Sequence, residues 1–196
     1  MEFSNGSTSG GGKKDNIFID KATITNCEIT YGEKKSWQTY ADDIAVELTL
    51  DIGKDFTPTF YMGGKFKVDD QSGMVIGWST AYKIKLFFEA IGQNIRLSKD
   101  KPLAGQRLPE EAADFCVGKS FKRLTYKSNK TKANGDPKWK DWQQVDSVDT
   151  PNADFKAKFL NAVDNQWIKD FLAVDDDVPF DTEVDTPNDI TADIPL

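Results

Sequence analysis

Cations and aromatic rings alternate within one segment of this sequence, and together they could bind a ligand that is both charged and flat. Eight bases and the single acid Asp136 lie between Lys119 and Lys140. The aromatic residues of this segment and its end are Phe121, Tyr126, Trp139 and Trp142. Single-stranded nucleic acid needs both kinds of group, because cations contact its phosphates and rings stack on unpaired bases at about 1–3 kcal/mol per base. The segment therefore predicts a site for single-stranded nucleic acid.

The positions of the tryptophans leave two interpretations open. Trp139 and Trp142 have opposite parity, so on a strand only one of them would point outward. The alternative is that both rings are core and the lysines keep a hairpin soluble. Trp37 and Tyr40 lie in the polar stretch 32–43, where exposed rings favour contact with a ligand. Their alternative role is a lid folded back on the domain.

The absence of histidine excludes several enzyme classes. Ser-His-Asp and Cys-His nucleophile pairs and the commonest zinc sites all need this residue. Cys27 and Cys116 lack the spacing of a metal site and fit a reducing cytoplasm. The sequence also contains no glycine-rich Walker loop for a nucleotide. We therefore expect a protein that is not an enzyme and that needs no metal or cofactor.

The net charge of −7 conceals a polarised molecule. From Asp170 to Leu196 there are nine acids and no base. Removing these nine of the 32 acids leaves 23 acids against 25 bases in residues 1–169, a net charge of +2. No run approaches the roughly 20 apolar residues that span a bilayer. We expect a basic surface, an acidic tail and no membrane partner.

Alternating apolar residues predict three strands in the first third of the chain. The stretch 17–31 is rich in β-branched residues, and its apolar phase changes near Thr25–Asn26, which predicts a bulge or a sharp bend. The stretch 44–52 alternates cleanly, and a third strand follows Pro58. The outward residues of this third strand are expected to be Tyr61, Lys65 and Lys67. Gly63-Gly64 interrupts it and marks a bend or the close approach of another backbone.

Helices and strands alternate in the rest of the chain. A helix with Ser79 or Thr80 as its cap should end at Gly92, and a short helix should occupy 109–117. Two strands are expected at 120–127 and 138–148, and an amphipathic helix from about 154 to 173, carrying Phe155, Phe159, Val163, Trp167 and Phe171. The predicted organisation is a Gly/Ser arm at 1–16, one domain at 17–150, a packed C-terminal helix at 151–174 and a disordered acidic tail at 175–196.

Three strands, a helix and two strands, with a long bent first strand, form the layout of an OB-fold. This fold is a partly open barrel that binds oligonucleotides or oligosaccharides on its strand 2–3 face and in two loops. We predict a mainly β protein, a five-stranded OB-fold barrel with a helix between strands 3 and 4. Its groove would join the third strand to the loop between strands 4 and 5. The candidate nucleic-acid-binding residues are Trp37, Tyr40, Tyr61, Lys65, Lys67, Lys122, Arg123, Tyr126, Lys127, Lys130, Lys132, Lys138, Trp139 and Lys140.

The acidic end contains the pattern Asp175-Asp176-Asp177-Val178-Pro179-Phe180. It resembles the acidic tip of bacterial single-stranded DNA-binding proteins, and Asp193-Ile194-Pro195-Leu196 resembles it more weakly. The resemblance implies a tether that docks on replication or recombination proteins, with carboxylates for steering and Pro-Phe as the anchor. Sixteen residues follow Phe180, so this copy has no free terminal carboxylate. A merely solubilising tail is the alternative.

The body of the chain is similar to the compact single-stranded DNA-binding proteins of bacteriophages, and residues 77–83, GWSTAYK, are similar to stretches in that family. The resemblance implies sequence-independent binding and protection of single-stranded DNA during replication, recombination or repair in a bacterial host. A recombination mediator and an oligosaccharide-binding module are alternatives. A carboxylate-metal nuclease built on Glu33-Lys34-Lys35 with Asp15 or Asp20 is a third. The oligomeric state stays open, with a homo-oligomer among the options.

Overall fold

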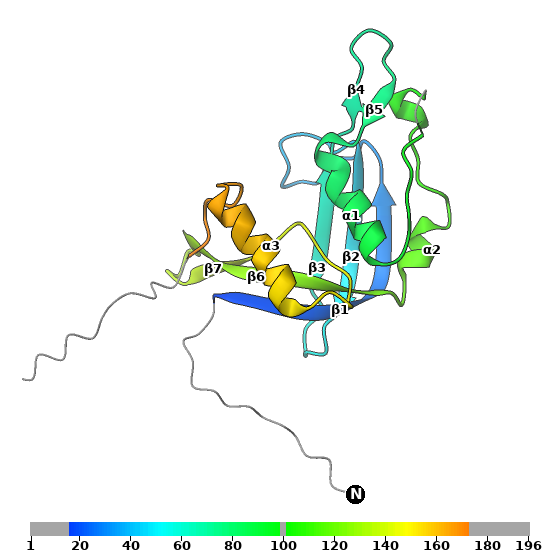
Figure 1. Ribbon diagram of the computed structural model, residues 1–196. Helices are drawn as coiled ribbons and strands as arrows, with labels where there is room; N and C mark the ends of the chain where they lie inside the picture. Colours follow the sequence, from blue (N-terminus) through cyan, green and yellow to red (C-terminus); the bar gives the residue numbers. More distant parts are fainter. Residues whose placement is uncertain (1–15, 99–100, 173–196) are drawn as a thin grey trace, which may run out of the picture.

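A computed structural model describes residues 16–98 and 101–172 of the chain. It confirms the mainly β class: five antiparallel strands form a nearly closed barrel in the order β3-β2-β1-β6-β7 (Figure 1). These strands are β1 (Ile17–Thr30), β2 (Ile44–Asp51), β3 (Thr59–Gly64), β6 (Ser120–Thr131) and β7 (Pro137–Asp141). The other elements are the hairpin β4 (Lys67–Val68) and β5 (Val75–Gly77), the helices α1 (Tyr82–Ala90), α2 (Ala112–Cys116) and α3 (Asn152–Asp164), and the short 3-10 helices η1 (Ser79–Ala81) and η2 (Leu103–Gly105).

Two predicted segments fall outside this description. They are the Gly/Ser arm up to residue 15 and the acidic tail with Asp175, Asp176, Asp177, Val178, Pro179 and Phe180. Within the described residues, no helix is long and apolar enough to cross a membrane.

A bend in β1 lets one strand serve both halves of the barrel. The first half of β1, up to Thr23, pairs with β6, and the second half, from Thr23 onward, pairs with β2. The register shifts between Ile24 and Asn26, which confirms the bulge predicted there. Because an extra residue reverses the faces of a strand, Ala22 and Ile24 face the barrel core and Ile29 still packs against it.

The third predicted strand is divided by a sharp turn. β3 ends at Gly64, and Lys67 belongs to the separate hairpin β4–β5 instead of the barrel. A Cβ on Gly64 would lie 2.6 Å from the Ala81 backbone, and one on Gly63 would lie 2.0 Å from the Asp42 carboxylate. The predicted close approach of another backbone is thus confirmed at Gly64. The chain therefore turns away after Gly64, where it packs against the Ala81 backbone, instead of continuing as a barrel strand.

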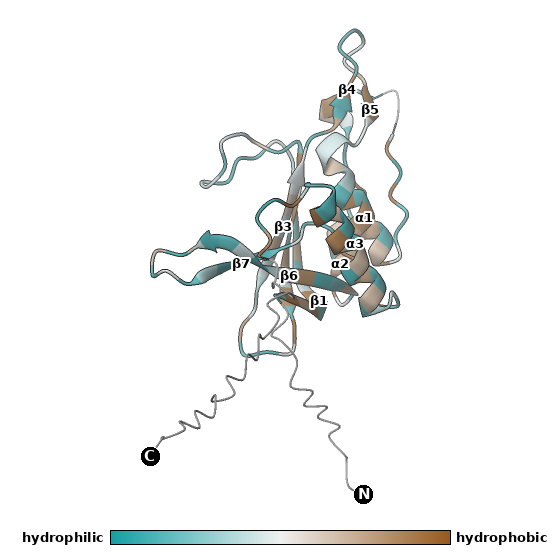
Figure 2. Ribbon diagram, turned by 60° about the vertical axis from the view of Figure 1, so that its left-hand side comes forward, coloured by the Kyte–Doolittle hydropathy of each residue, from teal (hydrophilic) through white to brown (hydrophobic). Residues whose placement is uncertain are grey.

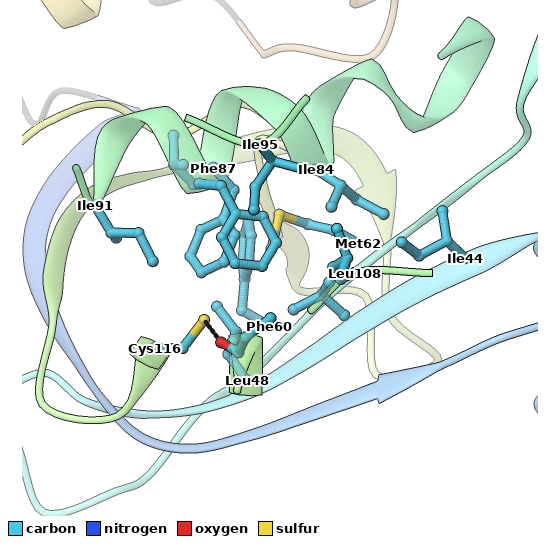
Figure 3. Packing of buried hydrophobic residues seen from close by; sticks show 14 of the residues in the cluster. Ile44, Leu48, Phe60, Met62, Ile84, Phe87, Ile91, Ile95, Leu108 and Cys116 are labelled. Atoms are coloured by element: carbon cyan, nitrogen blue, oxygen red, sulfur yellow. Dashed lines mark hydrogen bonds between the residues drawn. The ribbon is translucent and has the colours of Figure 1, made fainter. Parts of the chain in front are cut away.

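The main core fills the barrel and is closed by α1. The rings of Phe87 from α1 and Phe60 from β3 lie with their centroids 5.6 Å and 6.0 Å from the ring of Phe121 on β6. Figure 3 shows Phe87, Phe60 and Met62 pointing into one cluster. The 3-10 helix η1 (Ser79–Ala81), which leads directly into α1, lies beside the end of β3, because the Ala81 amide donates to the Lys65 carbonyl at 3.0 Å. Thr80 does not cap this helix as expected, because its hydroxyl accepts a hydrogen bond from the Lys65 backbone at 2.8 Å.

A second core lies between β6 and α3, on the outer face of the sheet (Figure 1). Leu124 and Tyr126 have the opposite parity to Phe121 and pack against Phe155 and Phe159 of the helix. The helix ends at Asp164, about nine residues before the predicted end near 173. The predicted strand 138–148 is also shorter, because β7 ends at Asp141.

The two ends of the described chain meet beside β6. The Lys127 amide donates to the Asn16 carbonyl at 2.8 Å, and the Leu172 amide donates to the Lys127 carbonyl at 2.9 Å. The Asn16 side chain in turn donates to the Leu172 carbonyl at 2.7 Å. Leu172 therefore lies at the base of the β6–β7 hairpin, among the lysines of the basic segment.

Candidate nucleic-acid interface

An open cleft of about 570 Å³ occupies the gap between the barrel edges β3 and β7. We call it the β3–β7 cleft. Neither strand is paired on this side, because they are the two ends of the strand order. The loop between β1 and β2 closes one side, and the first turn of α1 contributes to the wall. Its lining residues are Trp37, Gln38, Asp42, Thr59, Phe60, Tyr61, Gly63, Lys83, Lys140, Asp141 and Gln143.

Trp37 and Tyr61 form an aromatic wall of this cleft. Their rings meet edge to face, with centroids 5.0 Å apart and an interplanar angle of 85°. Trp37 remains 67% exposed, so this ring rests on Tyr61 without being buried as a lid. Tyr40, on the same loop, is also exposed but does not line the cleft. An exposed indole held in place by a neighbour is suited to stacking on a flat ligand.

Polar contacts hold Tyr61 in position. Its hydroxyl donates to Asp42 Oδ2 at 2.8 Å and accepts from Gln38 Nε2 at 3.0 Å. Burial, with the Asp42 hydrogen bond as a second cause, raises the pKa of Tyr61 to about 12. The phenol is therefore neutral at physiological pH, and it acts as a fixed support for the Trp37 ring.

Two lysines bring positive charge to the other side of the cleft. Lys83 of α1 donates to the amide oxygen of Gln143 at 3.3 Å, and burial lowers the pKa of its ammonium group. Lys140 of β7 pairs with Asp170, and this hydrogen bond is the main cause that lowers the pKa of the Asp170 carboxyl. The charge of Lys140 is thus partly balanced, whereas the hydrogen bond of Lys83 goes to a neutral group.

The β6–β7 hairpin carries most of the predicted basic residues. It projects from the barrel, with hydrophilic residues along much of its length (Figure 2). Trp139 on this hairpin is exposed and packs on Phe18, with ring centroids 5.0 Å apart, while Trp142 is buried under α3. The prediction that only one of the two tryptophans points outward is therefore confirmed. The accessible lysines of the hairpin are Lys127, Lys130, Lys132 and Lys138.

The structure removes two predicted residues from any exposed interface. Arg123 is 5% exposed and Tyr126 is 7% exposed. Arg123 lies 3.6 Å from Asp141 and 4.0 Å from Asp20, while Tyr126 packs under α3. Lys122 is half-buried and donates to the carbonyl of Thr150. The physical reason is that one face of β6 lies inside the barrel and the other packs against α3. Neither face of this strand is therefore fully open to solvent.

The two lysines predicted on the third strand lie apart from the cleft. Lys65 forms an ion pair with Asp43 at 2.9 Å, and Lys67 lies on β4. Of the predicted residues, Trp37, Tyr61 and Lys140 line the β3–β7 cleft. The charged and amide residues of its lining that sequence reasoning missed are Gln38, Asp42, Lys83, Asp141 and Gln143. Lys83 enters only through the packing of α1 on the barrel, which no local pattern encodes.

The residues of the nuclease alternative that the structure describes are not brought together, and Asp15 lies outside the described residues. Asp20 lies near the start of β1, whereas Glu33 lies beyond its end. Lys35 forms an ion pair with Glu47 at 2.6 Å, and Asp20 is 3.3 Å from Lys54. In the part of the chain that the structure describes, no group of three or more His, Cys, Asp or Glu residues could hold a metal ion.

Fold and cleft together define a mainly β protein with a nearly closed five-strand barrel and, at its opening, an aromatic cleft whose lining includes two lysines and two aspartates. No protein-family model matches the chain, and comparisons with curated proteins and with solved structures find no match.

Proposed function

We propose that this protein binds single-stranded DNA without sequence preference, in the β3–β7 cleft and along the β6–β7 hairpin. The observation that carries the proposal is the exposed Trp37 ring, supported by Tyr61, with Lys83 in the same cleft. A flat ring and a cation within one groove match the two repeating parts of a single strand, its bases and its phosphates. No single hydrogen-bonding pattern is needed for this, because every base has a face that can stack.

The barrel layout supports the same proposal. The helix α1 follows the third barrel strand, and the cleft lies between that strand, the first barrel loop and the last hairpin. OB-folds use this strand and these two loops to bind oligonucleotides. We therefore assign the barrel to the OB class, with α3 as an additional helix on its outer face.

The acidic tail gives this protein a second proposed role. Its carboxylates would steer basic partners of the replication or recombination machinery, and Val178, Pro179 and Phe180 would supply the buried anchor. The described chain ends at Leu172, which is hydrogen-bonded to Lys127 on the basic hairpin. The last described residue before the tail therefore lies beside Lys127, one of the lysines that we assign to DNA.

Tryptophan fluorescence during titration with oligo(dT) tests the proposal, with duplex DNA titrated in parallel. We expect quenching by the single strand, weakening with salt, and a much smaller response to duplex. Trp37→Ala should weaken binding about 5- to 150-fold, which corresponds to about 1–3 kcal/mol for one stacked base. Phe56→Ala is the matched control, because Phe56 is exposed but lies in the loop after β2 and does not line the β3–β7 cleft. Equal affinity for single strand and duplex, or an unchanged Trp37→Ala variant, would contradict the proposal.

A further inference from the structure

A second cleft, of about 340 Å³, adjoins the β3–β7 cleft on the other side of residues 141–144. We call it the Trp167 cleft. Lys83, Asp141 and Gln143 line both clefts, so the two hollows are neighbours with one shared wall. The rest of the lining of the Trp167 cleft includes residues of the first turn of α1 and of the turn after α3, which is orange in Figure 1.

Trp167 is the most exposed of the tryptophan rings at 74%, although the sequence pattern places it on the buried face of a helix. The helix ends before it, and Gln166 adopts a left-handed φ of 58°, which is unfavourable for a residue with a side chain. The turn is held by hydrogen bonds from the Gln166 amide to Val163 at 2.9 Å and from the Trp167 amide to Ala162 at 3.0 Å. These two hydrogen bonds form a Schellman cap at the end of α3, and the cap leaves the Trp167 ring in solvent beside the cleft. A large exposed ring at a hollow surface is the kind of feature that binds a ligand.

The charges of this second cleft favour an anionic ligand. Its two acids are engaged: Asp170 accepts hydrogen bonds from Lys140, Tyr126 and Ser128, and Asp141 faces Arg123. Its two cations are Lys83 and the exposed Lys169. The ligand-facing charge is therefore positive, next to an exposed indole.

We propose that the Trp167 cleft is a second base-stacking subsite for the same single strand. Lys83 would contact the phosphate that passes from one cleft to the other, with Trp37 and Trp167 stacking on bases to either side. This inference rests on the function proposed above and extends the path of the strand from the barrel opening onto the α1 and α3 side of the molecule.

Binding as a function of oligonucleotide length tests this path. Fluorescein-labelled oligo(dT) of about 4 to 16 nucleotides, the range bound by OB domains, is titrated with protein at constant salt and followed by anisotropy. Trp167→Ala should weaken binding of the long oligonucleotides about 5- to 150-fold and leave the shortest ones unchanged, because those fill only the β3–β7 cleft. Trp167→Phe should keep most of the affinity, and Phe56→Ala should behave like the wild type at every length.

The outcomes separate this inference from the proposed function. If Trp37→Ala weakens binding and Trp167→Ala binds long oligonucleotides like the wild type, the second subsite is rejected and the first cleft stands. If Trp167→Ala weakens all lengths equally, Trp167 is not a separate subsite and the inference again fails. If neither substitution changes binding, or if the wild type binds no oligonucleotide, both proposals fail. Because Trp167 is largely in solvent, its removal should leave the fold intact, and circular dichroism verifies this.

Discussion

Replacement of Lys83 by glutamine tests the electrostatic part of the proposed site with a single charge. Lys83 lies in both clefts and donates to the amide oxygen of Gln143, so its ammonium group is not neutralised by that contact. Burial lowers the pKa of Lys83, and the nearby Asp42 carboxylate opposes this shift but forms no ion pair with the ammonium group. A phosphate would supply that direct contact. Glutamine keeps a polar side chain at this position and removes only the charge.

The expected magnitude follows from counterion release. Each contact between a cation and a phosphate changes the slope of log affinity against log salt by about −0.7 on single strands. Among the described residues, the lysines of the cleft and hairpin that form no ion pair with a carboxylate are Lys83, Lys127, Lys130, Lys132 and Lys138. If all of these reach phosphates, the wild-type slope should be about −3.5, and that of Lys83→Gln about −2.8.

Dissociation constants for oligo(dT) at several salt concentrations give these slopes. Lys85→Gln is the matched control, because Lys85 is on the same helix, loses the same charge and pairs with Glu89 at 3.2 Å without lining either cleft. A slope that Lys83→Gln leaves unchanged, or that Lys85→Gln changes equally, would refute the assignment of Lys83 to a phosphate.

Three further predictions concern stability and the tail. Asp170→Asn should destabilise the fold by about 1–3 kcal/mol near pH 7. Because the Lys140 hydrogen bond lowers the pKa of the Asp170 carboxyl, this stabilisation should disappear as the pH falls through that lowered pKa. Urea denaturation at several pH values should therefore show that the variant loses less free energy of unfolding on acidification than the wild type. Gly64→Ala should cost about 1–3 kcal/mol in the same assay, while Gly77→Ala, with 3.6 Å of room at its Cβ, should cost less. Deletion of residues 175–196 should tighten DNA binding at low salt by removing competing acids, and weaker or unchanged binding would reject this competition.

Local patterns were sufficient to predict much of the barrel. The phase change near Thr25–Asn26 indicated the bulge that bends β1, because the side-chain period of a strand reveals an inserted residue directly. Gly63-Gly64 likewise indicated the close approach of the chain at Ala81. Both features constrain the backbone at the residues themselves, so a local sequence pattern can reveal them.

The errors arise where a second layer of structure covers a strand. The mixture of bases and aromatic rings in this segment placed Arg123 and Tyr126 among the binding residues, yet Arg123 is buried beside Asp141 and Tyr126 packs under α3. A strand covered on both faces has no solvent side, and its sequence alone does not reveal the covering helix. The same helix stops early, which moves Trp167 from a predicted core position to the surface.

The composition of the candidate site is set by how α1 packs, and therefore by Gly64. The Ala81 amide donates to the Lys65 carbonyl at 3.0 Å, immediately after Gly64, so the 3-10 turn that leads into α1 touches the end of β3. Any side chain at Gly64 would push this turn away, since its Cβ would lie 2.6 Å from the Ala81 backbone. Lys83 is two residues further along, at the opening that β3 and β7 leave unpaired. The contact that completes the core is thus also the contact that brings a cation to the aromatic wall of Trp37 and Tyr61.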